Sequence, residues 1–363
     1  MKITFVLPTV NISGGIRVAL IHAKALRDSG HQVRLVFPPP KPPSFKENLK
    51  YFLNGKGWRR TTESNAKILS NLSMLQDCSI DHHVLKSWRP VIDADVPDAD
   101  IIIATWWETA EWVAALSPIK GIKVYLIQGH EIFANVPNRA QRTYWLPLHK
   151  LVISKWLQEV MRVLYRDVHC SLVENAVDHS QFDAPLRGKQ NVFTVGTLIS
   201  VSEGKNHALA INTIIEAKKL LPNLRVVAFG AHKAPEMLPG WVEYHINPSQ
   251  NKIPEIYSVC DAWLFTSRSE GFGLPILEAM ACRTPVLSTY AGAAPEIISS
   301  NNGRLLPDSV EDFVQAITEF ANMEDPDWKI LSDNAYRKAR EYSWDVATTK
   351  FELALTNLIN SEV

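Results

Sequence analysis

The chain alternates short apolar runs with longer segments in which apolar residues recur every three or four positions. The short runs are bounded by polar residues and predict buried parallel strands, whereas the longer segments predict amphipathic helices. In the first half of the chain, strands are predicted at residues 3–7, 32–37, 100–105, 122–127, 151–154 and 168–173, and helices at 16–27, 106–116 and 155–165. This order indicates βαβ units and therefore a parallel sheet covered by helices.

The second half of the chain repeats the alternation. Strands are predicted at residues 191–195, 224–229, 242–246 and 262–266, and helices at 206–220, 253–260, 274–281, 309–320, 328–342 and 344–360. A chain of 363 residues exceeds one ordinary core, so we expect two α/β domains. We expect the hinge between them in the polar segment at 178–190.

Residues 38–67 interrupt this rhythm, because the run PPPKPP at 38–43 can continue neither a helix nor a central strand. The following residues mix lysine and arginine with phenylalanine, tyrosine and tryptophan. Such a mixture suits a peripheral contact with a membrane or with an acidic acceptor, and it suits a solvated insertion equally well. Both interpretations stay open for residues 41–67.

Composition narrows the class of protein. Lysine plus arginine and aspartate plus glutamate number 38 each, so the formal net charge is zero and nothing indicates binding to nucleic acid. No apolar run approaches the length of a membrane span, and the first residues, MKITFVLP, are too short and strand-like for a signal peptide. The four cysteines predict free thiols in a cytoplasmic protein because they are scattered, at Cys78, Cys170, Cys260 and Cys282.

The strongest candidate for chemistry is the stretch SRSEGFGLPILEAMAC at residues 267–282. It follows a predicted strand, contains two glycines, and enters a predicted helix with Pro275 in its first turn. A helix N-terminus with free backbone amides at the carboxyl end of a sheet forms a site for anions. Glu270 lies in the loop, and Glu278 lies about one turn into the helix.

Carboxylates beside an anion site repel a phosphate, but they accept hydrogen bonds from hydroxyl groups. A nucleotide sugar carries hydroxyls on both sides of its diphosphate. We therefore expect the loop amides to bind the diphosphate, while one glutamate binds the ribose and the other binds the transferred sugar. These amides belong to Gly271, Phe272, Gly273 and Leu274. The simpler interpretation is a helix-capping glutamate and a surface glutamate.

The same residues resemble a known family. The run EGFGLPILEAMA at 270–281 and the following TPVLSTYAGAAPEII at 284–298 are similar to the signature of the family-four retaining glycosyltransferases. The resemblance implies an α/β structure of the GT-B fold, with two Rossmann-like domains facing across a deep cleft. It gives Glu270 the role of orienting the transferred sugar and Glu278 the role of binding the ribose.

The resemblance also implies where the domains lie. The segment ENAVD at 174–178 resembles the family's turn that closes the first domain. We expect an acceptor-binding N-terminal domain at residues 1–180 and a nucleotide-sugar-binding domain at 181–342. A C-terminal helix at 343–363 would cross back to the N-terminal domain.

Two further loops match the family in part. In such enzymes a Gly-Gly turn, here Gly14 and Gly15, faces the donor diphosphate, and the alternative is a tight turn that needs positive φ. A lysine, here Lys205, compensates the diphosphate charge. Thr197, which we count among the nucleotide-sugar-binding positions, stands where the family has an arginine. The candidate replacements for that arginine are Arg268 and Arg17.

His130 leaves the strand predicted at 122–127 beside a glycine. In the resembled family a polar residue of this loop reaches the donor sugar or the charge that develops near the anomeric carbon. We therefore assign His130 a catalytic role, with Glu131 as a second candidate. A lone histidine at such a position is alternatively structural.

Two acidic pairs, Asp93-Ala-Asp95 and Asp98-Ala-Asp100, mimic the DxD metal motif of the other glycosyltransferase fold. They precede their strand, whereas ligand sites form at the carboxyl ends of strands. We interpret them as solvated loop charges and predict no metal. The incomplete GxGxxG pattern argues against a dinucleotide, so we expect no cofactor besides the nucleotide diphosphosugar, which is a substrate.

These residues and the resemblance predict a retaining, metal-independent glycosyltransferase. It would move a sugar from a nucleotide diphosphosugar to a hydroxyl of a glycan or lipid-linked saccharide, for cell-surface polysaccharide, in the cytoplasm or at the inner face of the membrane. Two alternatives stay open. One is a nucleotide-sugar epimerase of the same architecture, and the other is a non-catalytic GT-B partner subunit, which Thr197 in place of arginine favours.

Overall fold

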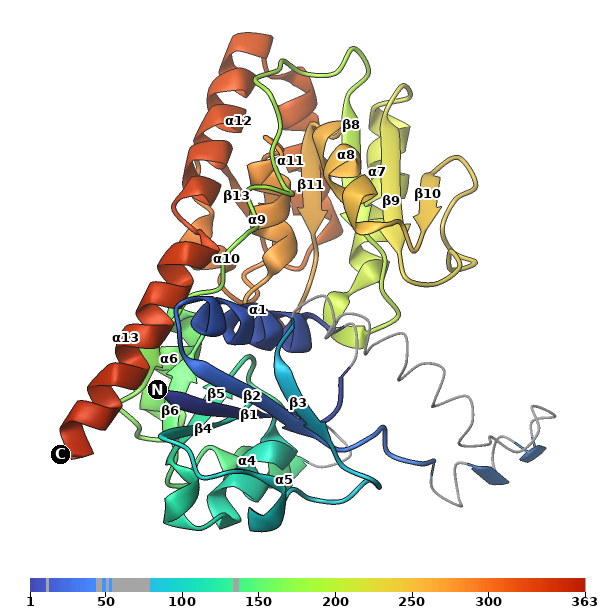
Figure 1. Cartoon of the computed structure of the whole chain (residues 1–363). Helices are drawn as coiled ribbons and strands as arrows, with labels where there is room; N and C mark the ends of the chain where they lie inside the picture. The colour runs from blue at the N-terminus through green and yellow to red at the C-terminus, as the bar shows by residue number, and fades with distance from the viewer. Residues whose placement is uncertain (11–12, 44–47, 50–51, 54–78, 133–136, 363) are drawn as a thin grey trace. The chain divides into compact units, whose positions relative to one another are not determined.

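The computed structural model describes residues 1–10, 13–43, 48–49, 52–53, 79–132 and 137–362 (Figure 1). The chain divides into two compact units. Unit 1 consists of Met1–Ile153, Gln158–Val173 and Thr348–Val363, and unit 2 consists of Ser154–Leu157 and Glu174–Ala347. Each unit is built on its own parallel sheet.

The sheet of unit 1 has seven strands in the order β3-β2-β1-β4-β5-β6-β7. They are β1 (Lys2–Val6), β2 (Gln32–Phe37), β3 (Asp81–Val84), β4 (Ile101–Ala104), β5 (Ile122–Ile127), β6 (His149–Val152) and β7 (Ser171–Leu172). The helices are α1 (Gly14–Asp28), α4 (Trp107–Ala115), α5 (Pro137–Thr143), most of α6 (Lys155–Leu164) and most of α13 (Trp344–Glu362). The chain builds the sheet outward from β1, first through β2 and then through β4, so the order reverses between β1 and β4.

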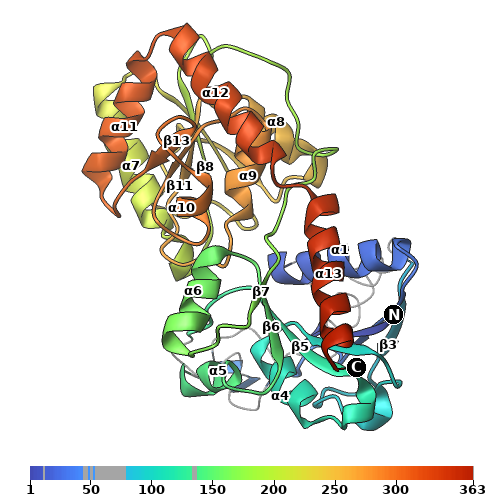
Figure 2. The same ribbon diagram turned by 90° about the vertical axis from the view of Figure 1, so that its left-hand side faces the viewer.

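The sheet of unit 2 has six strands in the order β10-β9-β8-β11-β12-β13. They are β8 (Thr194–Leu198), β9 (Arg225–Gly230), β10 (Glu243–Ile246), β11 (Ala262–Phe265), β12 (Val286–Ser288) and β13 (Gly303–Leu305). The helices are α7 (His207–Leu220), α8 (Ile253–Ser258), α9 (Leu274–Ala281), α10 (Ala294–Ile297), α11 (Val310–Asn322) and α12 (Asp325–Arg340). In Figure 2, α7 and α11 lie on one side of this sheet and α9 and α12 on the other.

Strand β11 shows why the central strands are continuous apolar runs. Ala262 and Leu264 belong to the core that the sheet forms with α7 and α11. Trp263 points to the opposite face, where its ring packs on Tyr257 of α8 with centroids 4.4 Å apart. Since both faces of the strand are covered, every position is buried and no polar alternation is possible.

The order of the predicted strands and helices is confirmed, and the elements without a prediction include the edge strands β3 and β13 and the short helices α5 and α10. β3 reads DHHV and β13 reads GRL, so neither has the apolar run that predicts a strand. An edge strand pairs on one side and stays partly exposed, which removes the need for such a run. At another edge, β7 has only two residues, although a strand is predicted over 168–173.

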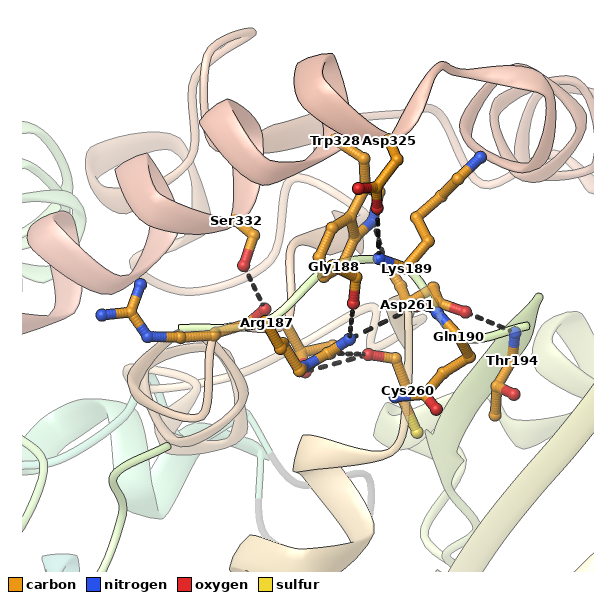
Figure 3. Close-up of polar contacts among 12 residues, drawn as sticks. Arg187, Gly188, Lys189, Gln190, Thr194, Cys260, Asp261, Asp325, Trp328 and Ser332 are labelled. Atoms are coloured by element: carbon orange, nitrogen blue, oxygen red, sulfur yellow. Dashed lines mark hydrogen bonds and ion pairs between the residues drawn. The ribbon is translucent and has the colours of Figure 1, made fainter. Parts of the chain in front are cut away.

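Residues 187–190, in the segment expected to act as a hinge, are bound within unit 2 (Figure 3). The Arg187 guanidinium lies over the Trp328 ring, 4.7 Å from its centroid, and 3.4 Å from an oxygen of the buried Asp261. Asp261 also accepts a hydrogen bond from the backbone N–H of Gln190, at 2.9 Å. We therefore expect any hinge to lie before Arg187.

The last helix, α13, packs its final part onto unit 1. Phe351 is fully buried, with its ring stacked on Phe5 of β1 and on His22 of α1 at centroid distances of 6.3 and 4.5 Å. The next residue, Glu352, has its carboxylate oxygen Oε1 2.9 Å from Nε2 of His31. These contacts explain why residues from Thr348 onward belong to unit 1.

Two interpretations of the sequence are corrected. Neither Gly14 nor Gly15 has a positive φ, so a strained turn does not explain this pair. Of the acidic pairs, Asp93, Asp98 and Asp100 are exposed as expected, whereas Asp95 forms an ion pair with Arg89 and its side chain is only 8% exposed. Among the residues that the structure describes, no group of three metal-binding side chains is placed to hold an ion.

Part of the sequence-based predictions falls outside the described residues. The undescribed residues include Lys56, Arg59 and Arg60 of the basic and aromatic segment, together with Cys78. The free thiols are confirmed for the other three cysteines, which are all buried. Within the described ranges, no helix combines the length and the hydropathy that crossing a membrane requires.

Candidate functional site

In unit 2 the glycine-rich loop links β11 to α9. Gly273 precedes the first residue of α9 and has φ of +101°, a conformation that favours glycine. A Cβ at this position would lie 3.0 Å from the Phe265 ring and 3.1 Å from Ile276. The loop therefore needs glycine to turn sharply from the strand into the helix. This turn puts the N-terminus of α9 at the carboxyl end of β11.

A second loop meets the first because β8 and β11 are neighbours in the sheet. After β8, the chain forms a short 3-10 helix at Glu203–Lys205. The backbone N–H of Arg268 donates to the Gly204 carbonyl at 2.8 Å, and the Thr266 hydroxyl donates to the Lys205 carbonyl at 3.3 Å. The strand order reverses between β8 and β11, and ligands bind at such switch points in open α/β sheets.

Lys205 and Glu270 form an ion pair at this switch point. The Lys205 side chain is 30% exposed and the Glu270 side chain 12% exposed. The Ser267 hydroxyl donates to the same Glu270 oxygen at 2.7 Å. Gly292, in the loop after β12, lies beneath Glu270, since a Cβ there would come within 2.7 Å of the Glu270 Cβ. The two predicted catalytic groups of unit 2 are thus held together.

Glu278 lies about one turn into α9 and accepts a hydrogen bond from the Tyr257 hydroxyl of α8 at 3.0 Å. Tyr257 is fully buried, and this burial raises the pKa of its hydroxyl well above the usual value. The hydroxyl therefore stays protonated and donates. Phe272 is buried, and its carbonyl accepts from the Ala293 N–H at 2.8 Å, which fixes the loop between the two glutamates.

Two predictions remain for unit 2: the role of Thr197 and the cation that replaces the family's arginine. Thr197 is buried in β8, and its hydroxyl donates to the Leu264 carbonyl of β11 at 3.2 Å, so this hydroxyl is used within the sheet. Arg268, one candidate for the missing arginine, is 63% exposed and pairs with Asp308 at 2.5 Å. The other candidate, Arg17, lies in α1 of unit 1.

Unit 1 has a cavity of about 510 Å³ at the carboxyl ends of β1, β4 and β5. Gly15 lines this cavity, and its carbonyl accepts a hydrogen bond from the Gln128 side chain at 3.0 Å. Gly14, the first residue of α1, has open space where a Cβ would be. The cavity lies where the strand order reverses, between β1 and β4, as the ion pair does in unit 2.

His130 and Glu131 follow β5 in unit 1. His130 is within hydrogen-bonding distance of the Tyr165 hydroxyl, at 2.7 Å, and partial burial lowers the pKa of its ring. Glu131 lines the cavity, and burial raises the pKa of its carboxyl to about 8. The Glu131 backbone N–H donates to the Tyr144 hydroxyl at 2.8 Å, which fixes the loop.

Sequence reasoning missed the residues that position these groups. Tyr257 is 21 positions from Glu278, and no motif marks it. Ser267 belongs to the motif but had no distinguishing feature beside other loop serines. In the cavity of unit 1, Trp88 lies between the strands predicted at 32–37 and 100–105, and Lys41 lies shortly after the first of these, where no site is predicted.

Comparison with known proteins identifies the larger part of unit 2. Residues 180–341 match the model of the family "Glycosyl transferases group 1". Over these residues the chain is similar to the group 1 glycosyltransferases. The match confirms the resemblance in the motif at 270–281, and it places Lys205, Glu270 and Glu278 within the group 1 region.

Two curated relatives illustrate the group 1 match. O-antigen chain mannosyltransferase B of Escherichia coli is 30% identical over 112 residues, which are 31% of this chain and 29% of that protein. A probable sucrose-phosphate synthase of Thermosipho melanesiensis is 30% identical over 119 residues, or 31% of this chain and 26% of the relative. The alignments thus span less than a third of these relatives.

Solved structures share the fold along almost the whole chain. HepE of Anabaena, solved with UDP and glucose, has a TM-score of 0.75 at 16% identity, covering 98% of this chain and 100% of HepE. A variant of Staphylococcus aureus TarM, solved with Fondaparinux, alpha-GlcNAc-glycerol and UDP, has a TM-score of 0.70 at 14% identity, covering 98% and 100%. These similarities confirm the GT-B fold.

Proposed function

We propose that this chain transfers a sugar from a nucleotide diphosphosugar to a hydroxyl of a saccharide acceptor, with retention of the anomeric configuration. The observation that carries this proposal is the ion pair of Lys205 and Glu270 at the switch point of unit 2, beside the N-terminus of α9. The group 1 match supports the activity, and HepE with UDP and glucose supports the donor class. The E. coli relative supports a role in polysaccharide synthesis.

Such an enzyme must first stabilise the leaving group, because the diphosphate gains negative charge as the sugar departs. In our proposal, backbone amides at the start of α9 and the ammonium of Lys205 stabilise that charge. The ion pair with Glu270, whose position is fixed by the hydrogen bond from Ser267, already holds Lys205 in this region before a ligand binds. A preorganised cation needs little rearrangement in the transition state, which is the condition for efficient electrostatic catalysis.

The two glutamates then divide the hydroxyl groups of the donor. Glu270, in the loop before α9, binds hydroxyls of the transferred sugar. Glu278, oriented by Tyr257, binds the ribose. From unit 1, we propose that His130 contacts the charge developing near the anomeric carbon, with Tyr165 holding its ring. Thr197 is not included, because its hydroxyl already binds the Leu264 carbonyl.

For retention we propose a front-face transfer. The bond between the anomeric carbon and the diphosphate oxygen breaks, the acceptor oxygen bonds to the same face of that carbon, and a diphosphate oxygen takes the acceptor proton. This route needs no covalent nucleophile. Isolation of a glycosyl-enzyme adduct would contradict it.

The experiment is an activity panel with UDP-glucose, GDP-mannose and dTDP-rhamnose. A transferase slowly releases a nucleoside diphosphate from one donor by hydrolysis, and release accelerates when an acceptor glycan is added. Proton NMR of the product gives the anomeric configuration. Interconversion of nucleotide sugars would indicate an epimerase, and no turnover of any donor would indicate a non-catalytic partner subunit.

We also propose that residues 41–67 contact a membrane surface, because this segment mixes cations with aromatic side chains. Reversing the charges of Lys56, Arg59 and Arg60 should reduce sedimentation with vesicles containing an anionic lipid. A matched triple reversal at exposed cations of unit 2 is the control. Equal binding by both variants would remove the proposal.

A further inference from the structure

The cavity of unit 1 has the position and the walls of a ligand site. It opens at the carboxyl ends of three adjacent strands, where the strand order reverses. Its volume of about 510 Å³ is within the usual range for small-molecule pockets. Trp88 and Trp106 both line it, and such rings offer flat apolar faces beside polar groups. A sugar ring, which has apolar faces and hydroxyl groups at its edge, would fit a cavity lined in this way.

Glu131 is the unusual group in this cavity. Its carboxylate receives a hydrogen bond from the backbone N–H of Trp107, the first residue of α4. The second carboxylate oxygen, Oε2, is buried and has no hydrogen-bond partner among the described residues. Buried polar atoms in folded proteins nearly always have a partner, and an exception calls for an explanation. A ligand hydroxyl in the adjoining cavity provides one.

Neighbouring charges do not account for the raised pKa of Glu131. The hydroxyls of Tyr125 and Tyr144 lie near it, and their pKa values are raised first by burial and then by the nearby Glu131 carboxylate. Lys41 and Glu108 line the same cavity, but neither contributes to the shift of Glu131, which burial dominates. Lys41 instead lies over the Trp88 ring, 4.2 Å from its centroid.

We propose that Glu131 is the specificity-determining residue of an acceptor site in this cavity, where its protonated carboxyl binds a hydroxyl of an uncharged pyranose stacked on a tryptophan ring. This inference rests on the proposed glycosyl transfer. A carboxylic acid has one donor and an acceptor, so it can pair with both the oxygen and the hydrogen of one sugar hydroxyl. An acidic sugar would be disfavoured, because ionising Glu131 would bring two negative charges together.

The binding test uses the full chain and saturation-transfer NMR with methyl α-glycosides of glucose, mannose and rhamnose. At least one glycoside should show transfer to the wild type and to Glu131→Gln, which keeps a donor and an acceptor. The signal should disappear in Glu131→Leu, which fills the site with an apolar group. Glu111→Gln, on the outer side of α4 and paired with Arg139, is the matched control and should behave as wild type. Equal signals in Glu131→Leu and wild type would overturn the proposal.

The kinetic test separates this inference from the proposed function. Acceptor-independent hydrolysis of the donor and KM for the acceptor should both be unchanged in Glu111→Gln, whereas KM for the acceptor should rise about tenfold to hundredfold in Glu131→Leu. In wild type, KM for the acceptor should rise as the pH passes about 8, and in Glu131→Gln it should not. If wild type hydrolyses no donor, the proposed function fails. If it does, and the acceptor KM of Glu131→Leu equals that of wild type, only the inference fails.

Discussion

The two sheets of this protein carry opposite chemistry at equivalent positions. Each has its strand order reversed beside the first strand of its unit, β1 or β8, and each has polar residues at the carboxyl ends there. Unit 2 presents a partly exposed ion pair and a helix N-terminus. Unit 1 presents a buried acid and two tryptophan rings in a cavity. The same topology therefore fixes where a ligand binds, while the loops decide which ligand.

The two sites differ in how far their ionisable groups are exposed to water. Lys205 and Glu270 both keep contact with water, so their charges are available to a charged ligand. Burial raises the pKa of Glu131, and no cation among the described residues forms an ion pair with its carboxyl, so Glu131 favours its neutral form. A diphosphate matches the first environment, and an uncharged sugar ring matches the second. Each prediction below changes one side of this contrast.

The largest effect is expected from Lys205→Ala. Loss of a preorganised contact to the leaving diphosphate should lower kcat by roughly 10²–10³. Because the pair is partly exposed, the melting temperature should change little. Lys252→Ala, which removes an exposed lysine paired with Glu255 in the same unit, is the control and should keep full activity. A normal kcat in Lys205→Ala would end the assignment of unit 2 as the donor site.

The next effect concerns stability, and Glu131→Gln should increase it. The pKa of Glu131 is about 8 in the folded chain, against an ordinary value of 4.5 for a glutamate carboxyl. Between these values the unfolded chain releases the proton and the folded chain keeps it, so stability falls as the pH rises. At pH 7 this costs at most about 3 kcal/mol, which Gln avoids. Urea unfolding at pH 5 and pH 8 should show the advantage of Glu131→Gln growing with pH, and a constant difference would contradict the account.

A smaller effect is expected from removing the hydrogen-bond partner of Glu278, the residue that we propose binds the ribose. Tyr257→Phe deletes the hydrogen bond to Glu278 but keeps the buried ring. Nucleoside diphosphate affinity, measured by calorimetry, should fall about tenfold, because the bond to a charged group contributes on the order of 1.5 kcal/mol. Tyr244→Phe, which removes a hydroxyl bound to the His232 carbonyl, is a matched control. Equal losses in both variants would point to general destabilisation.

The smallest effect is expected from EDTA. If Lys205 and the start of α9 compensate the diphosphate charge, the initial rate of the chelated enzyme should equal that of the untreated enzyme within error. Added MgCl₂ should then not increase it. If the rate disappears with EDTA and returns with Mg²⁺, a metal ion helps unit 2 to compensate the diphosphate charge.

The sequence predicts the proposed donor site of unit 2 better than the proposed acceptor site of unit 1. Glu270 and Glu278 belong to one contiguous motif, and the strand before it is apolar because both of its faces are covered. The pairing of Lys205 with Glu270 depends on β8 lying beside β11, which local patterns do not specify. Trp88, Trp106 and Glu131 converge through three separate segments and match no motif. The burial of Glu131, which gives it its character, is a property of the folded chain alone.

The most direct test of the central claim is a thermal-shift panel with UDP, GDP, ADP, CMP and dTDP on wild type, Glu278→Ala and Lys252→Ala. A ligand that binds the folded state raises the melting temperature by mass action. We predict a rise with one nucleoside diphosphate in wild type and Lys252→Ala, and its loss in Glu278→Ala. No rise with any nucleotide, or the same rise in Glu278→Ala, would contradict the claim that the sheet edge of unit 2 binds the donor.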